Sequence, residues 1–81
     1  MRSFLILQRA KNVKRHEDGT PWTWEAGDEI AQFKNIDSFI AYVENNIKEL
    51  GADVVCLSGS ASLISSTNHY LAQQQRKAGL L

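Results

Sequence analysis

The sequence has few of the features that mark exported or membrane proteins. Among 81 residues there is one cysteine, which excludes an internal disulfide, whereas small secreted domains usually depend on several. The apolar run Phe4–Leu7 is shorter than the roughly 7–15 residues of a signal-peptide core. No apolar stretch approaches the ~20 residues of a membrane span. We therefore expect one compact domain, residues 1–81, in the cytoplasm and without membrane contact.

The chain also lacks net charge. Its nine basic and nine acidic side chains cancel, unlike those of a strongly basic nucleic-acid binder. The two signs are nonetheless separated along the sequence. Residues 1–16 carry five basic side chains and no acid, while residues 17–53 hold all nine acids and two lysines. A molecule with one basic and one acidic block can orient on a partner that carries both signs.

Apolar patterns predict an α+β fold. Two runs, Phe4–Leu7 and Val54–Leu57, have apolar residues on both faces of a period-2 strand and are typical of interior strands. Between them, one apolar stripe at helical spacing predicts a helix over residues 37–50, with Asp37 as its N-cap. A second helical pattern follows the loop after the later run and covers residues 63–77.

The segment between the first strand and the first helix is harder to assign. It contains turn-forming residues at 16–21 and then Trp22 and Trp24. Residues 9–28 form either a hairpin or a loop. We expect strands at 3–10, 29–34 and 53–58. The fold is then a small three-stranded sheet, or a four-stranded one if the tryptophan segment joins it, with two helices in the order β-β-α-β-α. A right-handed crossover through the first helix would make the later strands parallel, so the sheet would be mixed.

The same patterns predict the core and exclude several kinds of site. We expect these apolar positions to be largely buried: Leu5, Leu7, Phe39, Ile40, Val43, Ile47, Val55, Leu57, Leu63 and Leu71. Cys56 lies among apolar neighbours in a strand, so we interpret its thiol as packed rather than catalytic. Neither His16 nor His69 has the spacing of a metal ligand. The sequence therefore predicts no catalytic residue, no metal and no cofactor.

The strongest functional signal is the combination of basic and aromatic residues early in the chain. Tryptophan and arginine are common anchors of protein interfaces. An exposed tryptophan lowers the solubility of a small domain unless a partner molecule buries it. We predict a partner-binding surface made of Arg9, Lys11, Lys14, Arg15, Trp22 and Trp24. The two tryptophans could equally belong to the core. The resulting hypothesis is a non-enzymatic protein that binds another protein as a regulator or inhibitor, and a homodimer is a further option.

Two alternatives use different chemistry. Basic groups that follow phosphates and aromatic rings that stack on bases are the parts of a single-stranded nucleic-acid binder, so the same surface suits that function. The second alternative is a small anion-binding domain or enzyme at the loop before the second helix, where backbone N–H groups could approach an anion. Its residues are Ser58, Gly59, Ser60 and Ser62.

Overall fold

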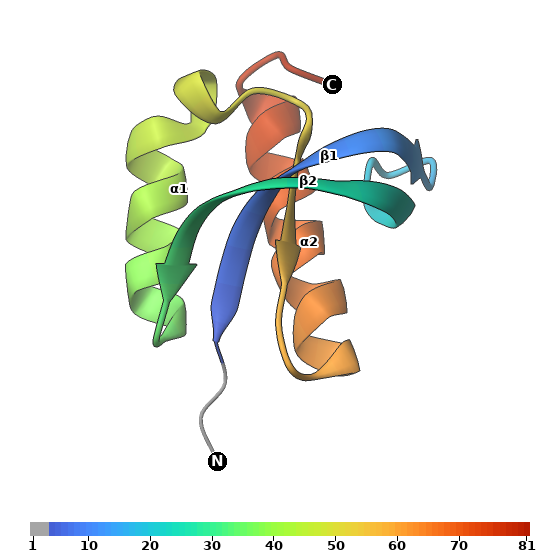
Figure 1. The fold of residues 1–81 in the computed structure, drawn as a ribbon. Helices are drawn as coiled ribbons and strands as arrows, with labels where there is room; N and C mark the ends of the chain where they lie inside the picture. Colours follow the sequence, from blue (N-terminus) through green and yellow to red (C-terminus); the bar gives the residue numbers. More distant parts are fainter. Residues whose placement is uncertain (1–3) are drawn as a thin grey trace.

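The computed structural model describes residues 4–81, and this part of the chain contains three strands and two helices. The elements are β1 (Leu5–Arg15), β2 (Pro21–Phe33), α1 (Ile36–Leu50), β3 (Val54–Leu57) and α2 (Ala61–Lys77) (Figure 1). Their order, β-β-α-β-α, confirms the predicted α+β fold class. Neither helix of residues 4–81 is long and apolar enough to cross a membrane.

The three strands form one sheet in the order β2-β1-β3. β1 pairs with each neighbour in the antiparallel direction, so β2 and β3 run the same way without touching. The expected mixed sheet is therefore corrected to an antiparallel one. The reason is that β3 pairs with the free edge of β1 and not with that of β2, beside which it would have been a parallel neighbour.

The hairpin of β1 and β2 is much longer than the sequence predicts. β1 continues past residue 10 to Arg15, and β2 begins at Pro21 rather than at residue 29. The first position of the predicted strand, residue 3, lies outside the described residues. The pairing register shifts between Gln8 and Ala10, where a Cβ atom on Gly27 would lie 2.8 Å from a backbone carbonyl oxygen of the facing strand. Glycine therefore permits this close approach.

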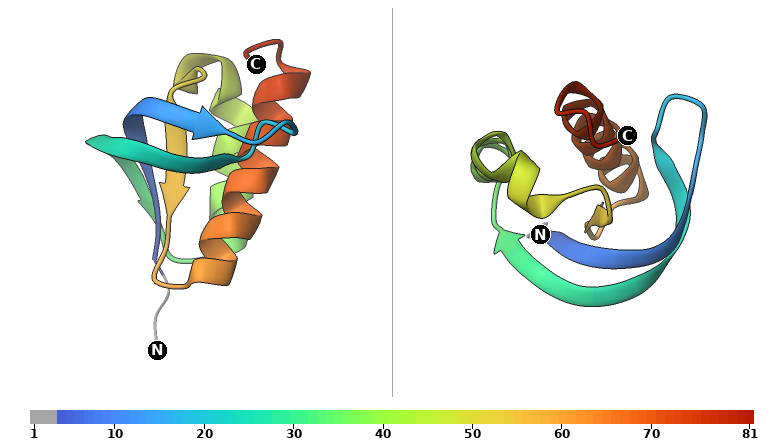
Figure 2. Two further views of the ribbon diagram at one scale, coloured as in Figure 1. Left: turned by 90° about the vertical axis from the view of Figure 1, so that its right-hand side faces the viewer. Right: turned by 90° about the horizontal axis from the view of Figure 1, so that it is seen from above.

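A second irregularity lies nearer the tip of the hairpin. The register shifts again between Lys11 and Lys14, and Asn12 between them has a left-handed φ of 52°. Such irregularities bend and twist a strand pair. Viewed from above, the hairpin follows an arc, both helices lie on its concave side, and its far end comes up beside α2 (Figure 2). This curvature brings residues of the tip to the surface of a helix that is more than 40 residues away in the sequence.

The ends of α1 are fixed by polar and glycine caps. Asn35 is the N-cap, because its side-chain oxygen accepts a hydrogen bond of 2.9 Å from the backbone N–H of Ser38. The predicted cap, Asp37, instead lies in the first turn, where its negative charge favours the positive end of the helix dipole. Gly51 ends the helix with a φ of 79°, which a glycine adopts without strain.

The core lies between the sheet and the two helices. It is a cluster of nine buried residues: Leu5, Leu7, Phe33, Phe39, Val43, Leu50, Val54, Cys56 and Leu71. Six of the ten positions predicted to be buried are buried in the structure. The other four are half-buried, namely Ile40, Ile47, Leu57 and Leu63. Cys56 has no exposed surface, in agreement with the prediction, and this burial raises the pKa of its thiol.

The outer edge of β3 is covered by polar side chains of α2. Asn68 accepts a hydrogen bond from the backbone N–H of Cys56 and donates one to its carbonyl, each at 2.7 Å. Gln75 donates to the carbonyls of Gly51 and Val54 at 3.0 and 3.4 Å. Asn68 and Gln75 are both buried. Their side chains hydrogen-bond to backbone groups that a fourth strand would otherwise pair with. α2 thus closes the sheet at this edge.

Candidate binding groove

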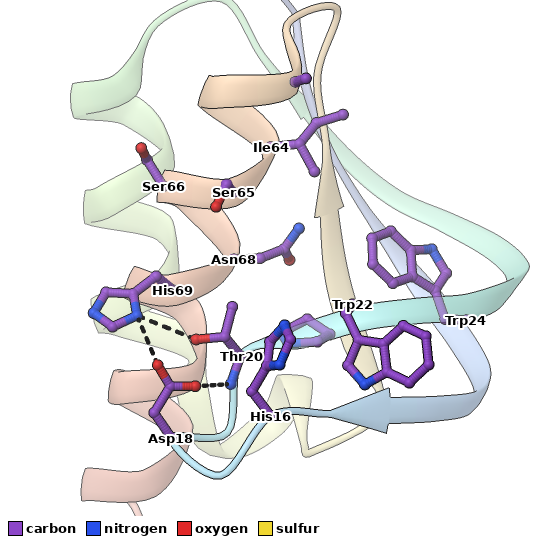
Figure 3. Close-up of a pocket in the computed structure, with 12 residues that line it drawn as sticks. His16, Asp18, Thr20, Trp22, Trp24, Ile64, Ser65, Ser66, Asn68 and His69 are labelled. Atoms are coloured by element: carbon purple, nitrogen blue, oxygen red, sulfur yellow. Dashed lines mark hydrogen bonds and ion pairs between the residues drawn. The ribbon is translucent and has the colours of Figure 1, made fainter.

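A groove of about 670 Å³ lies between the curved end of the hairpin and the first half of α2. One wall comes from the turn and the start of β2, and the other from one side of the helix (Figure 3). The residues that line it are His16, Asp18, Thr20, Pro21, Trp22, Trp24, Ala61, Ile64, Ser65, Ser66, Asn68 and His69. The size falls within the range of ordinary ligand pockets, about 300–1,000 Å³.

Both tryptophans line this groove. Trp22 and Trp24 are two residues apart on β2 and so lie on the same face of the strand, toward the groove. Trp22 is 57% exposed and Trp24 is half-buried, and neither belongs to the core cluster. The ring of His16 lies beside that of Trp22, with centroids 6.3 Å apart. This wall of the groove is therefore a set of neighbouring aromatic rings.

At its other end the groove is bounded by polar contacts between the hairpin tip and α2. Nδ1 of His69 lies 3.1 Å from the Thr20 hydroxyl and 3.6 Å from a carboxylate oxygen of Asp18 (Figure 3). The other carboxylate oxygen of Asp18 accepts from the backbone N–H of Thr20 at 2.9 Å. Hydrogen bonds from Thr20, chiefly from this N–H, lower the pKa of Asp18. A carboxylate is thus held at the mouth of the groove.

The tip itself is seated on the second half of α2. Gly19 is buried, and a Cβ atom at this position would lie 3.2 Å from Leu81 and 3.3 Å from the guanidinium of Arg76. The same guanidinium donates to the carbonyl of Glu17 at 3.2 Å. These contacts hold the hairpin tip against α2, beside the groove.

The contacts of His69 differ from those of a catalytic triad. In a triad the carboxylate faces one ring nitrogen of histidine and the nucleophilic hydroxyl faces the other. Here Asp18 and Thr20 both face Nδ1, while Nε2 lies 3.1 Å from the side-chain nitrogen of Gln73. This cluster joins the hairpin tip to the helix and does not align the Thr20 hydroxyl with a separate base.

The two arginines of the predicted partner-binding surface are engaged elsewhere. Arg9 donates to the carbonyl of Leu50 and forms an ion pair of 2.7 Å with Asp53. Arg15 donates to the carbonyls of Gly19 and Ala52 at 2.8 and 2.7 Å, and burial lowers its pKa. Both side chains therefore attach β1 to other segments of the fold, chiefly the turn between α1 and β3.

The two lysines lie on the opposite face of the hairpin. Lys11 pairs with Glu25 across the strands, and Lys14 pairs with Thr23. Directly paired residues share a face of a sheet, and the partners of both lysines alternate along β2 with the tryptophans. The six residues predicted to form one surface are thus separated into three pairs. Two tryptophans line the groove, two lysines lie on the opposite face of the hairpin, and two arginines are bound to other segments of the chain.

The serine-rich loop before α2 forms its own hydrogen bonds. The Ser60 hydroxyl accepts from the backbone N–H of Leu63 at 3.4 Å and lies 3.0 Å from the hydroxyl of Ser62. Ser58 donates its hydroxyl to the carbonyl of Ser60 at 2.9 Å, and Gly59 is exposed beside it. Ser60 is therefore the N-cap of α2, with Ser58 and Ser62 hydrogen-bonded to it.

The helix wall of the groove was missing from the prediction. Ile64, Asn68 and His69 come from a stretch of α2 whose serines and threonine weaken the helical pattern. The available signal was spacing, since residues four positions apart lie on one side of a helix. Nothing in the sequence indicates that this side faces the tryptophans, because the two segments meet only through the curvature of the hairpin.

No protein-family model, curated protein or solved structure matches the chain. The function of the groove is therefore inferred from the residues that line it. Within residues 4–81, no three histidine, cysteine, aspartate or glutamate side chains lie together in a way that could hold a metal ion. The chemistry that the groove does offer is aromatic stacking, apolar contact and hydrogen bonding around one carboxylate.

Proposed function

We propose that this protein acts in the cytoplasm by binding another protein, as a regulator or inhibitor, and that a segment of the partner lies in the groove between the hairpin and α2. The observation that supports this is the 57% exposure of Trp22, which lines the groove together with Trp24 and the apolar side chain of Ile64. Tryptophans in such positions supply a large share of the binding free energy at protein interfaces.

The shape of the site favours a peptide segment over a flat protein surface. The groove lies between a strand and a helix, and its lining contains both apolar and hydrogen-bonding groups. An extended peptide can offer side chains and backbone amides to both kinds of group. Because Asn68 already occupies the backbone groups of Cys56, the partner would bind through its side chains rather than as an added strand of the sheet.

A selection of random displayed peptides tests this function. Peptides selected on the wild-type protein should bind the Trp22→Ala variant at least about tenfold more weakly, because a tryptophan anchor commonly contributes more than 1.4 kcal/mol. Ile36→Ala is the matched control, since Ile36 is a similarly exposed apolar side chain at the start of α1. Selected peptides that bind the Trp22→Ala variant as well as the wild type would refute the proposed site.

Single-stranded nucleic acid is the competing partner, because exposed aromatic rings also stack on bases. The positions of the cations weigh against it, since Lys11 and Lys14 lie on the other face of the hairpin from the tryptophans. Titration with oligothymidylate at several salt concentrations separates the two functions. A nucleic-acid binder would show tryptophan quenching and an affinity that falls steeply as salt increases.

A further inference from the structure

The groove is lined by one carboxylate and by no lysine or arginine. Among the twelve lining residues Asp18 is the only acid, and none is a lysine or an arginine. The hydrogen bonds from Thr20 lower the pKa of this carboxylate, because they favour its charged form. A ligand in the groove therefore meets a negative charge at one end and the faces of aromatic rings along one wall.

Two arginines lie beside the hairpin tip, but neither lines the groove. Arg76 donates to the carbonyl of Glu17, and Arg15 donates to the carbonyls of Gly19 and Ala52. Each guanidinium is thus bound to backbone oxygens of its own chain. An anionic ligand would therefore meet no free lysine or arginine among the lining residues and would approach the carboxylate of Asp18.

We propose that the groove selects a basic segment of the partner protein, with a lysine or arginine side chain placed against the tryptophans and directed toward Asp18. This inference rests on the proposed function and names the class of partner. A cation over the face of tryptophan is attracted by the negative face of the ring. Trp22 and Trp24 supply such rings, and the carboxylate of Asp18 lies at the same groove. The attraction to the tryptophan rings and the attraction to the Asp18 carboxylate both favour a positively charged ligand.

Three matched peptides test the charge preference. Each is a heptapeptide that alternates alanine with one other residue, which is lysine, glutamine or glutamate. Binding is followed by tryptophan fluorescence and by the NMR signals of the two indole N–H groups. At about 20 mM salt the lysine peptide should bind at least about fivefold more tightly than the glutamine peptide, and the glutamate peptide most weakly. The difference should diminish at about 0.5 M salt.

A pair of isosteric variants tests the role of Asp18. The Asp18→Asn change removes the charge but keeps an oxygen that can accept from Thr20, so the turn should persist. It should weaken binding of the lysine peptide by about two- to fivefold and leave the glutamine peptide unchanged. The control is Asp28→Asn, which removes one negative charge at an exposed position of β2 that does not line the groove. The control should leave the affinity for the lysine peptide unchanged.

The results of these binding experiments distinguish a wrong charge preference from a wrong proposed function. Equal binding of the lysine and glutamine peptides, lost in the Trp22→Ala variant, would overturn the basic preference while leaving a peptide-binding groove. Tighter binding of the glutamate peptide would also overturn the preference. Quenching of Trp22 by oligothymidylate, with none of the three peptides bound, would overturn both proposals. Equal loss of lysine-peptide affinity in Asp18→Asn and Asp28→Asn would refute the role of Asp18.

Discussion

The side chain of Asn68 forms two hydrogen bonds of 2.7 Å with the backbone of Cys56, one as acceptor and one as donor. An amide side chain has one acceptor and one donor group in the geometry of a peptide bond, so it can replace a neighbouring strand at one position. β3 has only four residues, and this contact fastens its outer edge to α2. The asparagine is therefore a structural part of the sheet although it belongs to a helix.

Replacing Asn68 by alanine should destabilise the protein strongly. The change removes both hydrogen bonds and leaves the buried N–H and carbonyl of Cys56 without partners, at a cost of roughly 2–4 kcal/mol in the free energy of unfolding. Urea denaturation measures the loss, and hydrogen exchange of the Cys56 amide should accelerate. Asn45→Ala, at an exposed position of α1, is the control and should change stability by less than about 0.5 kcal/mol. Similar losses in the two variants would contradict this role.

The close approach of the hairpin strands predicts a large effect at Gly27. A methyl group there would lie 2.8 Å from the carbonyl oxygen of Arg9, so Gly27→Ala should destabilise the protein by about 1–3 kcal/mol. Nothing lies within 4 Å of a Cβ atom at Gly59, so Gly59→Ala is the matched control. Thermal unfolding of both variants measures the difference in melting temperature that this contact predicts. The contact at Gly27 would be unimportant if the two melting temperatures agreed.

Arg9 should contribute to stability rather than to partner binding. Its guanidinium contacts both the carbonyl of Leu50 at the end of α1 and the carboxylate of Asp53. Arg9→Ala should therefore lower the free energy of unfolding by about 1 kcal/mol, whereas Lys11→Ala, on the outer face of the hairpin, should change it by less than about 0.5 kcal/mol. Chemical denaturation compares the two. Equal effects of both changes would place Arg9 among ordinary surface charges.

The turn at the hairpin tip should loosen only in acid. The folded pKa of Asp18 lies below its unfolded value, which is about 3.9, because Thr20 donates to the carboxylate. The stabilisation by this group is thus complete above the unfolded pKa and is lost as the pH falls through the folded pKa. NMR titration of the Asp18 carboxyl carbon and the Thr20 amide measures this. The Asp18→Asn variant should lack the transition, and a midpoint above the usual aspartate value would contradict the assignment.

The elements that the sequence predicted well are those whose apolar residues define a face. In α1 a stripe of apolar side chains marks the side that packs on the sheet, so the predicted range, 37–50, agrees with the observed Ile36–Leu50 to within one residue. The predicted N-cap, Asp37, is two residues beyond the observed cap, Asn35. β3 is recognisable as a strand from its run of four apolar residues, Val54–Leu57. Its predicted interior place in the sheet was wrong, because β3 lies at the edge, where side chains of α2 cover it. These features are local, and local patterns are what a sequence displays most directly.

The outer half of the hairpin could not be recognised in this way. Between residues 9 and 28 most side chains of both strands are polar and face solvent, and the register shifts around Asn12 interrupt the alternation on which strand prediction depends. The sequence does not show that Arg9 binds the carbonyl of Leu50 and that Arg15 binds that of Ala52, because each carbonyl lies more than 35 residues later in the chain. The groove was missed for the same reason, since its two walls come from segments that are distant in the sequence.

This separation of the two walls has a consequence for finding the natural ligand. Unfolding takes residues 16–24 and 61–69 apart, so a ligand that contacts both walls binds only the folded state. A ligand at ten times its dissociation constant then adds about 1.4 kcal/mol to the free energy of unfolding, which raises the melting temperature of a domain this size by several degrees. The thermal stability of the whole protein thus reports the occupancy of one groove, and a melting assay can screen for the partner without a label.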